Sequence, residues 1–170
     1  MTDRLDIIEV KASLGINEAG EITGQAWVFS EPDSVGDIIT KGAFGSIASD
    51  LPILFQHDPT DIVGTWTEIT ATDDALVVKG KLHLERARAR SIRASVQSEL
   101  IKGLSIGFRT VKSTRDPRSG HRRLWEIDLW EISIVTFPMM DRARIAPGTA
   151  GGRKARLDRS LEAAISVFKH

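Results

Sequence analysis

The segments GLSIGFR (103–109) and LWEIDLWEISIV (124–135) both alternate apolar and polar side chains with a period of two. That period is typical of half-buried β-strands, so the sequence predicts a strand in each segment. In the first strand, Leu104 and the apolar residues that alternate with it face the core, and Ser105 and Gly107 face away from it. A glycine two residues after the serine predicts open space over the hydroxyl.

The second strand carries a carboxylate, Glu131, within its otherwise apolar second half. Burying an unpaired carboxylate costs several kcal/mol, so this side chain needs a partner. The few polar groups of the other apolar runs are the places to look for it. Among them His57 is the first candidate.

Composition and charge narrow the class of protein. A chain of 170 residues with 41% hydrophobic residues suits one domain with one core. The 23 basic and 23 acidic residues cancel, which gives no general reason to bind nucleic acid or an anionic membrane. The absence of cysteine excludes disulfides, thiolate metal sites and a cysteine nucleophile. The charged N-terminus lacks the apolar run of a signal peptide or membrane span, so we expect a soluble cytoplasmic protein.

Further periodic segments predict the remaining elements. Short strands are expected at residues 6–14, 20–30, 53–58, 62–66, 67–72 and 75–84, with a Pro59 turn closing the third. Helical spacing predicts a helix over 85–102, stopped by Gly103, and a basic amphipathic helix over 153–169. We therefore expect a mainly β fold with helices (α+β), a small closed β-barrel surrounded by a few helices. One domain would cover residues 1–146, and a linker and the C-terminal helix would cover 147–170.

The candidate chemistry joins His57, Ser105 and Glu131. A serine hydroxyl becomes a nucleophile when a positioned base takes its proton, and an acceptor on its second nitrogen orients a histidine for that task. The three residues lie in separate predicted strands, so only tertiary structure could bring them together. Other roles stay open: His57 could cap the turn at Asp58, Ser105 could bond backbone, and Glu131 could pair with Arg109 across the sheet.

Two other kinds of site are not favoured by the sequence. Histidines and carboxylates show no metal-ligand spacing, so no metal or other cofactor is expected. The arginines of the 85–102 segment are interpreted as a solvated helix face rather than a nucleic-acid site, because no aromatic residues are interleaved with them. They are Arg86, Arg88, Arg90 and Arg93.

Four motifs carry a family resemblance. They are GDII (36–39) with GAF (42–44), LFQHD (54–58) with VG (63–64), GLSIGF (103–108) and EISIVTFP (131–138). In this order they resemble the prohead maturation protease family of tailed bacteriophages and, more remotely, the herpesvirus assemblin proteases. The similarity runs from about residue 20 to residue 145, and Met139 and Met140 replace the small residues usual after the last motif.

The resemblance implies a herpesvirus-protease-like barrel and a serine endopeptidase with Ser105 as nucleophile and His57 as general base. The third member, which is a second histidine in the herpesvirus branch, would be Glu131 here. In those relatives an arginine-bearing loop contributes to the oxyanion hole. Arg115 and Arg118, in the predicted hairpin loop, are therefore the oxyanion candidates.

The resemblance also implies a place in phage assembly. The protein would cleave scaffold and major capsid protein segments inside the procapsid, in the host cytoplasm, and would cleave itself. A homodimer is a further expectation, whereas a specific nucleic acid or a membrane is not expected as a partner. The alternative is an inactive capsid-assembly or scaffold-like protein that keeps the same barrel.

Overall fold

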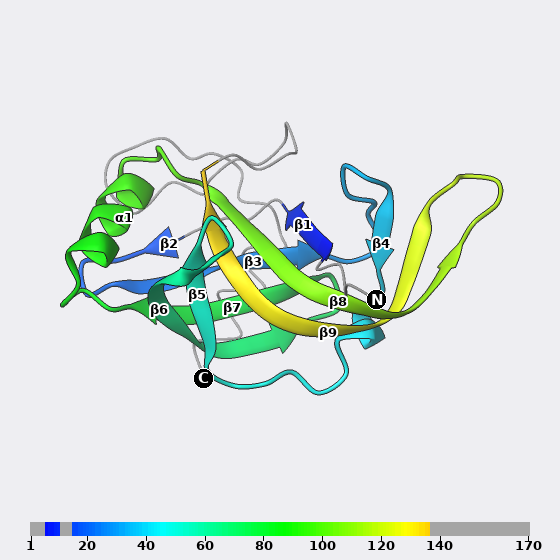
Figure 1. Cartoon of the computed structure of the whole chain (residues 1–170), viewed down its shortest axis with the longest axis horizontal. Helices are drawn as coiled ribbons and strands as arrows, with labels where there is room; N and C mark the ends of the chain where they lie inside the picture. Colours follow the sequence, from blue (N-terminus) through cyan, green and yellow to red (C-terminus); the bar gives the residue numbers. More distant parts are fainter. Residues whose placement is uncertain (1–5, 11–14, 137–170) are drawn as a thin grey trace.

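β-strands dominate the computed structural model, which describes residues 6–10 and 15–136. In chain order the elements are β1 (Asp6–Val10), β2 (Gly15–Ile16), β3 (Glu21–Val28), β4 (Asp37–Ile39), the 3₁₀-helix η1 (Lys41–Phe44), β5 (Leu51–Phe55), β6 (Asp58–Ala71), β7 (Ala75–Leu82), α1 (Ala87–Gln97), β8 (Gly103–Arg115) and β9 (Arg122–Val135) (Figure 1). The mainly β fold with few helices is thus confirmed. The predicted C-terminal helix lies outside the described residues.

One sheet contains all of these strands. Its hydrogen-bonded order is β1-β8-β9-β5-β6-β7-β3-β2, and β4 pairs with β9 off this path. The two strands predicted from the alternating segments form the antiparallel β8–β9 hairpin, whose distal part extends beyond the rest of the sheet (Figure 1). On its other side β9 pairs in parallel with β5, so β8, β9 and β5 are three adjacent strands.

The closed barrel expected from the sequence is wrong. β1 and β2 stand at the two ends of the hydrogen-bonded order, and within the described residues no ladder joins them. The sheet still curves around one core, which includes Trp27 of β3, Trp66 of β6 and Phe108 of β8. β2 has only two residues and β1 only five, which leaves little backbone for a closing ladder.

The internal helix is shorter than the predicted 85–102. It ends at Gln97 because Glu99 adopts a left-handed backbone with φ 61°, and the N–H groups of Leu100 and Ile101 bond back to the Ser95 carbonyl. Gly103 begins β8 instead of stopping the helix. Among the described residues, no helix is long and apolar enough to span a membrane.

The arginines around this helix are mostly exposed, and each also makes a hydrogen bond or ion pair. The guanidinium groups of Arg86 and Arg93 donate to the carbonyls of Ile62 and Glu18, and that of Arg90 donates to the Leu84 carbonyl. Arg88 pairs with Asp61 and lies 4.6 Å from the centre of the Phe55 ring. These contacts dock the helix onto the sheet.

Gly64, on β6 between β5 and β7, is expected to be required for stability. A Cβ there would lie 2.4 Å from the Lys81 carbonyl oxygen and 3.0 Å from Leu82 Cα. Since both are backbone atoms, Gly64→Ala must push β6 and β7 apart, and we expect it to lower the free energy of unfolding by roughly 1–3 kcal/mol. The effect is measured by comparing the thermal unfolding of Gly64→Ala with that of a control, Gly42→Ala. The Cβ added at Gly42 meets nothing within 4 Å. Equal melting temperatures for the two variants would contradict this account.

Candidate active site

His57 lies in the two-residue turn between β5 and β6, where Phe55 pairs with Asp58. Gln56 and His57 both have left-handed backbones, with φ 55° and 60°, the conformation that two-residue hairpin loops favour. The predicted turn at Pro59 is wrong, because Pro59 lies inside β6. Neither turn residue is the glycine or asparagine that usually marks such a loop, so the sequence did not show it.

The turn is hydrogen-bonded to two residues of β9 and to Thr136, the residue that follows the strand. The Gln56 N–H donates to the Ile134 carbonyl at 3.0 Å, and the Gln56 side chain bonds the Thr136 hydroxyl. The His57 N–H donates to Ser133 Oγ at 3.2 Å. These bonds hold the histidine backbone beside β9, and they therefore fix the point from which the imidazole side chain extends.

Ser105 is fully buried on β8, directly opposite Ser133 of β9. Its Oγ is 2.8 Å from His57 Nε2. The prediction of open space over the hydroxyl is wrong. The imidazole lies beside the hydroxyl, and the Glu131 side chain fills the space at Gly107. The hydroxyl therefore has a base within hydrogen-bond reach.

The carboxylate of Glu131 contacts the other nitrogen of the same ring. Glu131 Oε1 is 2.5 Å from His57 Nδ1, and the two side chains are only 9% and 13% exposed. Because an ionised carboxylate only accepts hydrogen bonds, Nδ1 is the donor. A neutral ring then leaves Nε2 as an acceptor for the Ser105 hydroxyl.

A β-bulge at Trp130 sets the direction of Glu131. Gly107 pairs with Glu131, but Phe108 pairs with Leu129, so Trp130 is an extra residue on β9. Leu129 packs against the core, and strict alternation would therefore turn Glu131 toward the core as well. The bulge reverses the parity, so that Ile132 enters the core and Glu131 faces His57.

Other polar residues near the hairpin have different partners. Arg109 pairs with Asp128, with Nη2 2.5 Å from Oδ2, while the two oxygens of Glu131 bond His57 and Ser133. Ser133 was missed by the sequence reasoning. The available signal was its position two residues after Glu131, on the same face of β9.

The structure does not bring Arg115 and Arg118 to this site. Arg115 ends β8 ten residues after Ser105, roughly 30 Å along the strand at the usual rise per residue, and its guanidinium donates to the Gly120 carbonyl. Arg118 lies in the loop beyond it, where its N–H donates to Asp116. In this arrangement the length of the hairpin separates the loop that follows the nucleophile strand from Ser105, and the oxyanion role of the two arginines stays a prediction.

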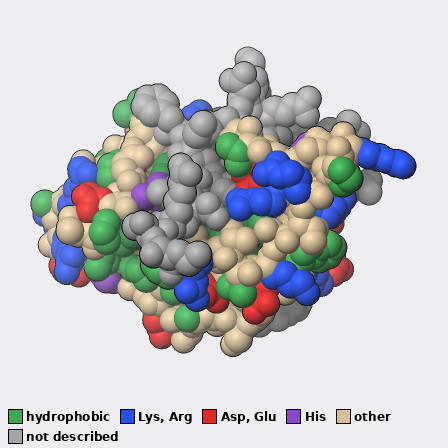
Figure 2. Space-filling view, turned by 45° about the vertical axis from the view of Figure 1, so that its right-hand side comes forward, with side chains coloured by type: hydrophobic (Ala, Val, Ile, Leu, Met, Phe, Trp, Pro, Cys, Tyr) green, Lys and Arg blue, Asp and Glu red, His purple; other side chains and the backbone are tan. Residues whose placement is uncertain are grey.

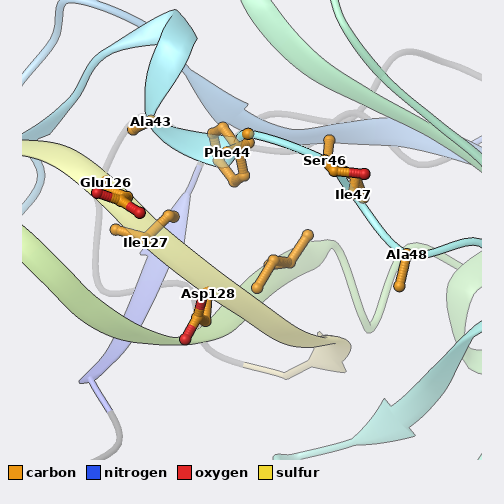
Figure 3. A pocket seen from close by; sticks show the side chains of 10 residues that line it. Ala43, Phe44, Ser46, Ile47, Ala48, Glu126, Ile127 and Asp128 are labelled. Atoms are coloured by element: carbon orange, nitrogen blue, oxygen red, sulfur yellow. The ribbon is translucent and has the colours of Figure 1, made fainter.

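The described residues also form a hollow that none of the three candidate site residues lines. A hollow of about 220 Å³ lies between the segment of η1 with its following loop and residues 126–129 of β9, which end two residues before Glu131 (Figure 3). No group of three or more potential metal ligands occurs in the described ranges. Basic and acidic side chains are interspersed on the face shown in Figure 2, in keeping with the balanced net charge.

Known proteins have sequences similar to that of this chain. Residues 6–156 match the profile of a family described as caudovirus prohead serine protease. The chain is 32% identical over 147 residues to the prohead protease of Enterobacteria phage HK97, covering 83% of this chain and 65% of that protein. It is 31% identical over 170 residues to the capsid polyprotein of Pseudomonas phage PAJU2, covering 94% of this chain and 23% of that protein. The chain thus spans less than two thirds of the length of either relative.

A solved structure shows the same fold. The bacteriophage T4 capsid assembly protease superposes with a TM-score of 0.58 over 79% of this chain and 98% of the other, at 12% sequence identity. At that identity the likeness concerns the fold alone. The remote resemblance to the herpesvirus assemblin proteases is not tested by these similarities and stays a prediction.

Proposed function

Because this chain belongs to the caudovirus prohead serine protease family, we propose that it is a serine endopeptidase that cleaves capsid proteins during phage head maturation. The observation that carries the proposal is the continuous series of contacts from Ser105 Oγ through the His57 ring to Glu131. A nucleophile, a base and an orienting carboxylate at these distances are the parts that acyl transfer requires.

In the proposed mechanism, Ser105 Oγ attacks the carbonyl carbon of the scissile peptide bond while His57 Nε2 takes the hydroxyl proton. Glu131 stabilises the imidazolium that forms and holds its Nδ1–H. The imidazolium then gives its proton to the leaving amine, and an ester of Ser105 remains. Water, deprotonated by His57, releases the new carboxyl terminus and restores the Ser105 hydroxyl.

The proposed substrates are the major capsid protein and scaffold segments, with self-cleavage as a further step. One relative is named a capsid polyprotein, and this chain matches only 23% of it. That match supports the view that the polyprotein contains a protease-like segment joined to capsid protein. In the proposal, protease and substrate meet inside the procapsid during assembly. The proposal also includes a division into a protease domain, 1–146, and a C-terminal segment, 147–170. It includes a homodimer as well.

Coexpression with a candidate capsid protein tests the function directly. The mass of the capsid subunit should fall by a discrete N-terminal segment in the presence of this protein. An unchanged mass, under conditions where particles assemble, would favour the inactive assembly protein instead.

A fluorophosphonate reagent provides a second test that needs no known substrate. The serine oxygen would bond to phosphorus as fluoride leaves, and His57 would take the proton. A single adduct mapped to Ser105 is expected from the site geometry. Absence of any adduct on correctly folded protein would contradict an activated serine.

Glu131→Gln is expected to lower kcat by roughly 10³- to 10⁴-fold with little change in melting temperature, because the amide keeps the size of the side chain but not its charge. An amide that turns its NH₂ toward Nδ1 would also select the wrong tautomer of His57. Turnover of a capsid-derived peptide and thermal unfolding should be measured on the same preparation. Near-normal turnover combined with a depressed melting temperature would show a structural role for Glu131 instead.

A further inference from the structure

The Glu131 side chain lies directly against Gly107, its partner across the β8–β9 ladder. A Cβ on Gly107 would be 2.3 Å from Glu131 Oε1 and 2.9 Å from both Cδ and Cγ. These distances are far below van der Waals contact. The carboxylate therefore occupies the volume that any other residue at position 107 would fill with its side chain.

Backbone conformation does not explain the glycine. Gly107 is not among the described glycines with positive φ, and it lies inside β8, opposite the strand that carries the bulge. Its case also differs from that of Gly64, where the added Cβ would meet a backbone oxygen. At position 107 the obstacle is a side chain that can rotate, so the strands can stay in place while the carboxylate moves away from His57.

The second oxygen of the same carboxylate is held by Ser133. Ser133 is fully buried, and its hydroxyl donates to Glu131 Oε2 at 2.6 Å. The Ser133 hydroxyl oxygen in turn accepts the backbone N–H of His57 at 3.2 Å. One hydroxyl thus connects the carboxylate to the backbone that carries the imidazole.

We propose that Gly107 and Ser133 are positioning residues that together hold the Glu131 carboxylate against His57 Nδ1. Gly107 provides the space in which the carboxylate lies, and Ser133 fixes its second oxygen and its distance from the histidine turn. The proposal rests on the proposed protease function. Both residues act through Glu131, so their removal should lower kcat rather than raise KM.

Gly107→Ala should lower kcat for a capsid-derived peptide by about 10²-fold, the usual loss for a displacement of about 1 Å in a catalytic constellation. Gly42→Ala, with open space around its Cβ, is the matched control and should turn over normally. The decisive measurement is the double variant with Glu131→Ala. Without the carboxylate the added methyl has room, so Gly107→Ala should cost no further activity in that background.

Two results from the glycine variants would overturn the role of Gly107. One is a Gly107→Ala variant with wild-type kcat. The other is an equal additional loss from Gly107→Ala whether or not the Glu131 side chain is present. If Gly107→Ala alone does not fold, restoration of folding in the Glu131→Ala background would still locate the clash at the carboxylate, and continued misfolding would contradict it.

Ser133 is tested with two substitutions of nearly equal size. Ser133→Thr and Ser133→Val add the same bulk to the buried position, and only the first keeps the hydroxyl. We expect the valine variant to have a kcat at least about 10-fold below that of the threonine variant, as loss of a hydrogen bond to a charged group implies, with similar KM and melting temperature. Equal kcat values for the pair would remove Ser133 from the positioning role.

The fluorophosphonate label separates failure of this inference from failure of the proposed function. If wild-type protein is labelled at Ser105 and cleaves capsid protein, activity of the Gly107 and Ser133 variants tests the positioning role alone. If wild-type protein neither cleaves nor reacts, the protease function itself is wrong, and the positioning role falls with it.

Discussion

Ser105→Ala is expected to abolish cleavage, with kcat lower by roughly 10⁶-fold, the scale of loss on removing the nucleophile of a serine protease. The change removes the attacking oxygen from a fully buried residue and leaves no new charge in the core. The lost hydrogen bond to His57 should alter the free energy of unfolding by only about 1 kcal/mol. The protein should therefore be folded and inactive.

Mass measurement of the coexpressed capsid subunit and turnover of a capsid-derived peptide would both report this loss. Ser113→Ala, an exposed serine on the same strand, is the matched control and should cleave normally. Trimming by Ser105→Ala at the wild-type rate would refute the nucleophile assignment. It would leave the fold and the family membership intact.

Replacing His57 is expected to be almost as severe, but the choice of residue matters. His57 has φ 60°, a region that asparagine enters more readily than alanine. His57→Asn should therefore be inactive and close to normal stability, whereas His57→Ala should be inactive and less stable by about 1 kcal/mol or more. Comparing the two variants by turnover and thermal unfolding separates the lost base from the strained turn.

The double variant Ser105→Ala with His57→Asn tests whether the two side chains act as one unit. Once the nucleophile is absent, the base has no proton to take, so the second change should cost nothing further. Losses that add on a logarithmic scale would indicate independent roles for Ser105 and His57. Equal residual rates in the two single variants and the double variant are the expected result.

Local patterns were enough to predict most of the sheet. Alternation in 103–109 and 124–135 predicted the proximal part of β8 and most of β9, because burial of one face imposes a period of two on any half-buried strand. An isolated carboxylate in an apolar strand also predicted that Glu131 needs a partner, and the first candidate, His57, is the residue that contacts it. Desolvation is costly wherever the strand lies, so that inference did not depend on the fold.

The same local patterns could not predict which strands pair with one another over long sequence separations. Whether the sheet closes depends on which edge strands meet, and a short β2 ends the ladder without a signal in its own composition. The position of Arg115 relative to Ser105 was likewise not visible in local patterns. The two residues lie close in sequence, but the long β8–β9 hairpin carries Arg115 away from Ser105.

Tertiary structure decided the geometry of the site at two places, one turn and one β-bulge. The left-handed turn at Gln56 and His57 forms without glycine because Ser133 and Ile134 of β9, and Thr136 just after it, hold the turn in place. The bulge at Trp130 reverses the faces of β9 and turns Glu131 toward the imidazole. Residue types and their alternation are local properties that a sequence displays, but the parity of a bulged strand and the conformation of a clamped turn depend on the strands that pack beside them.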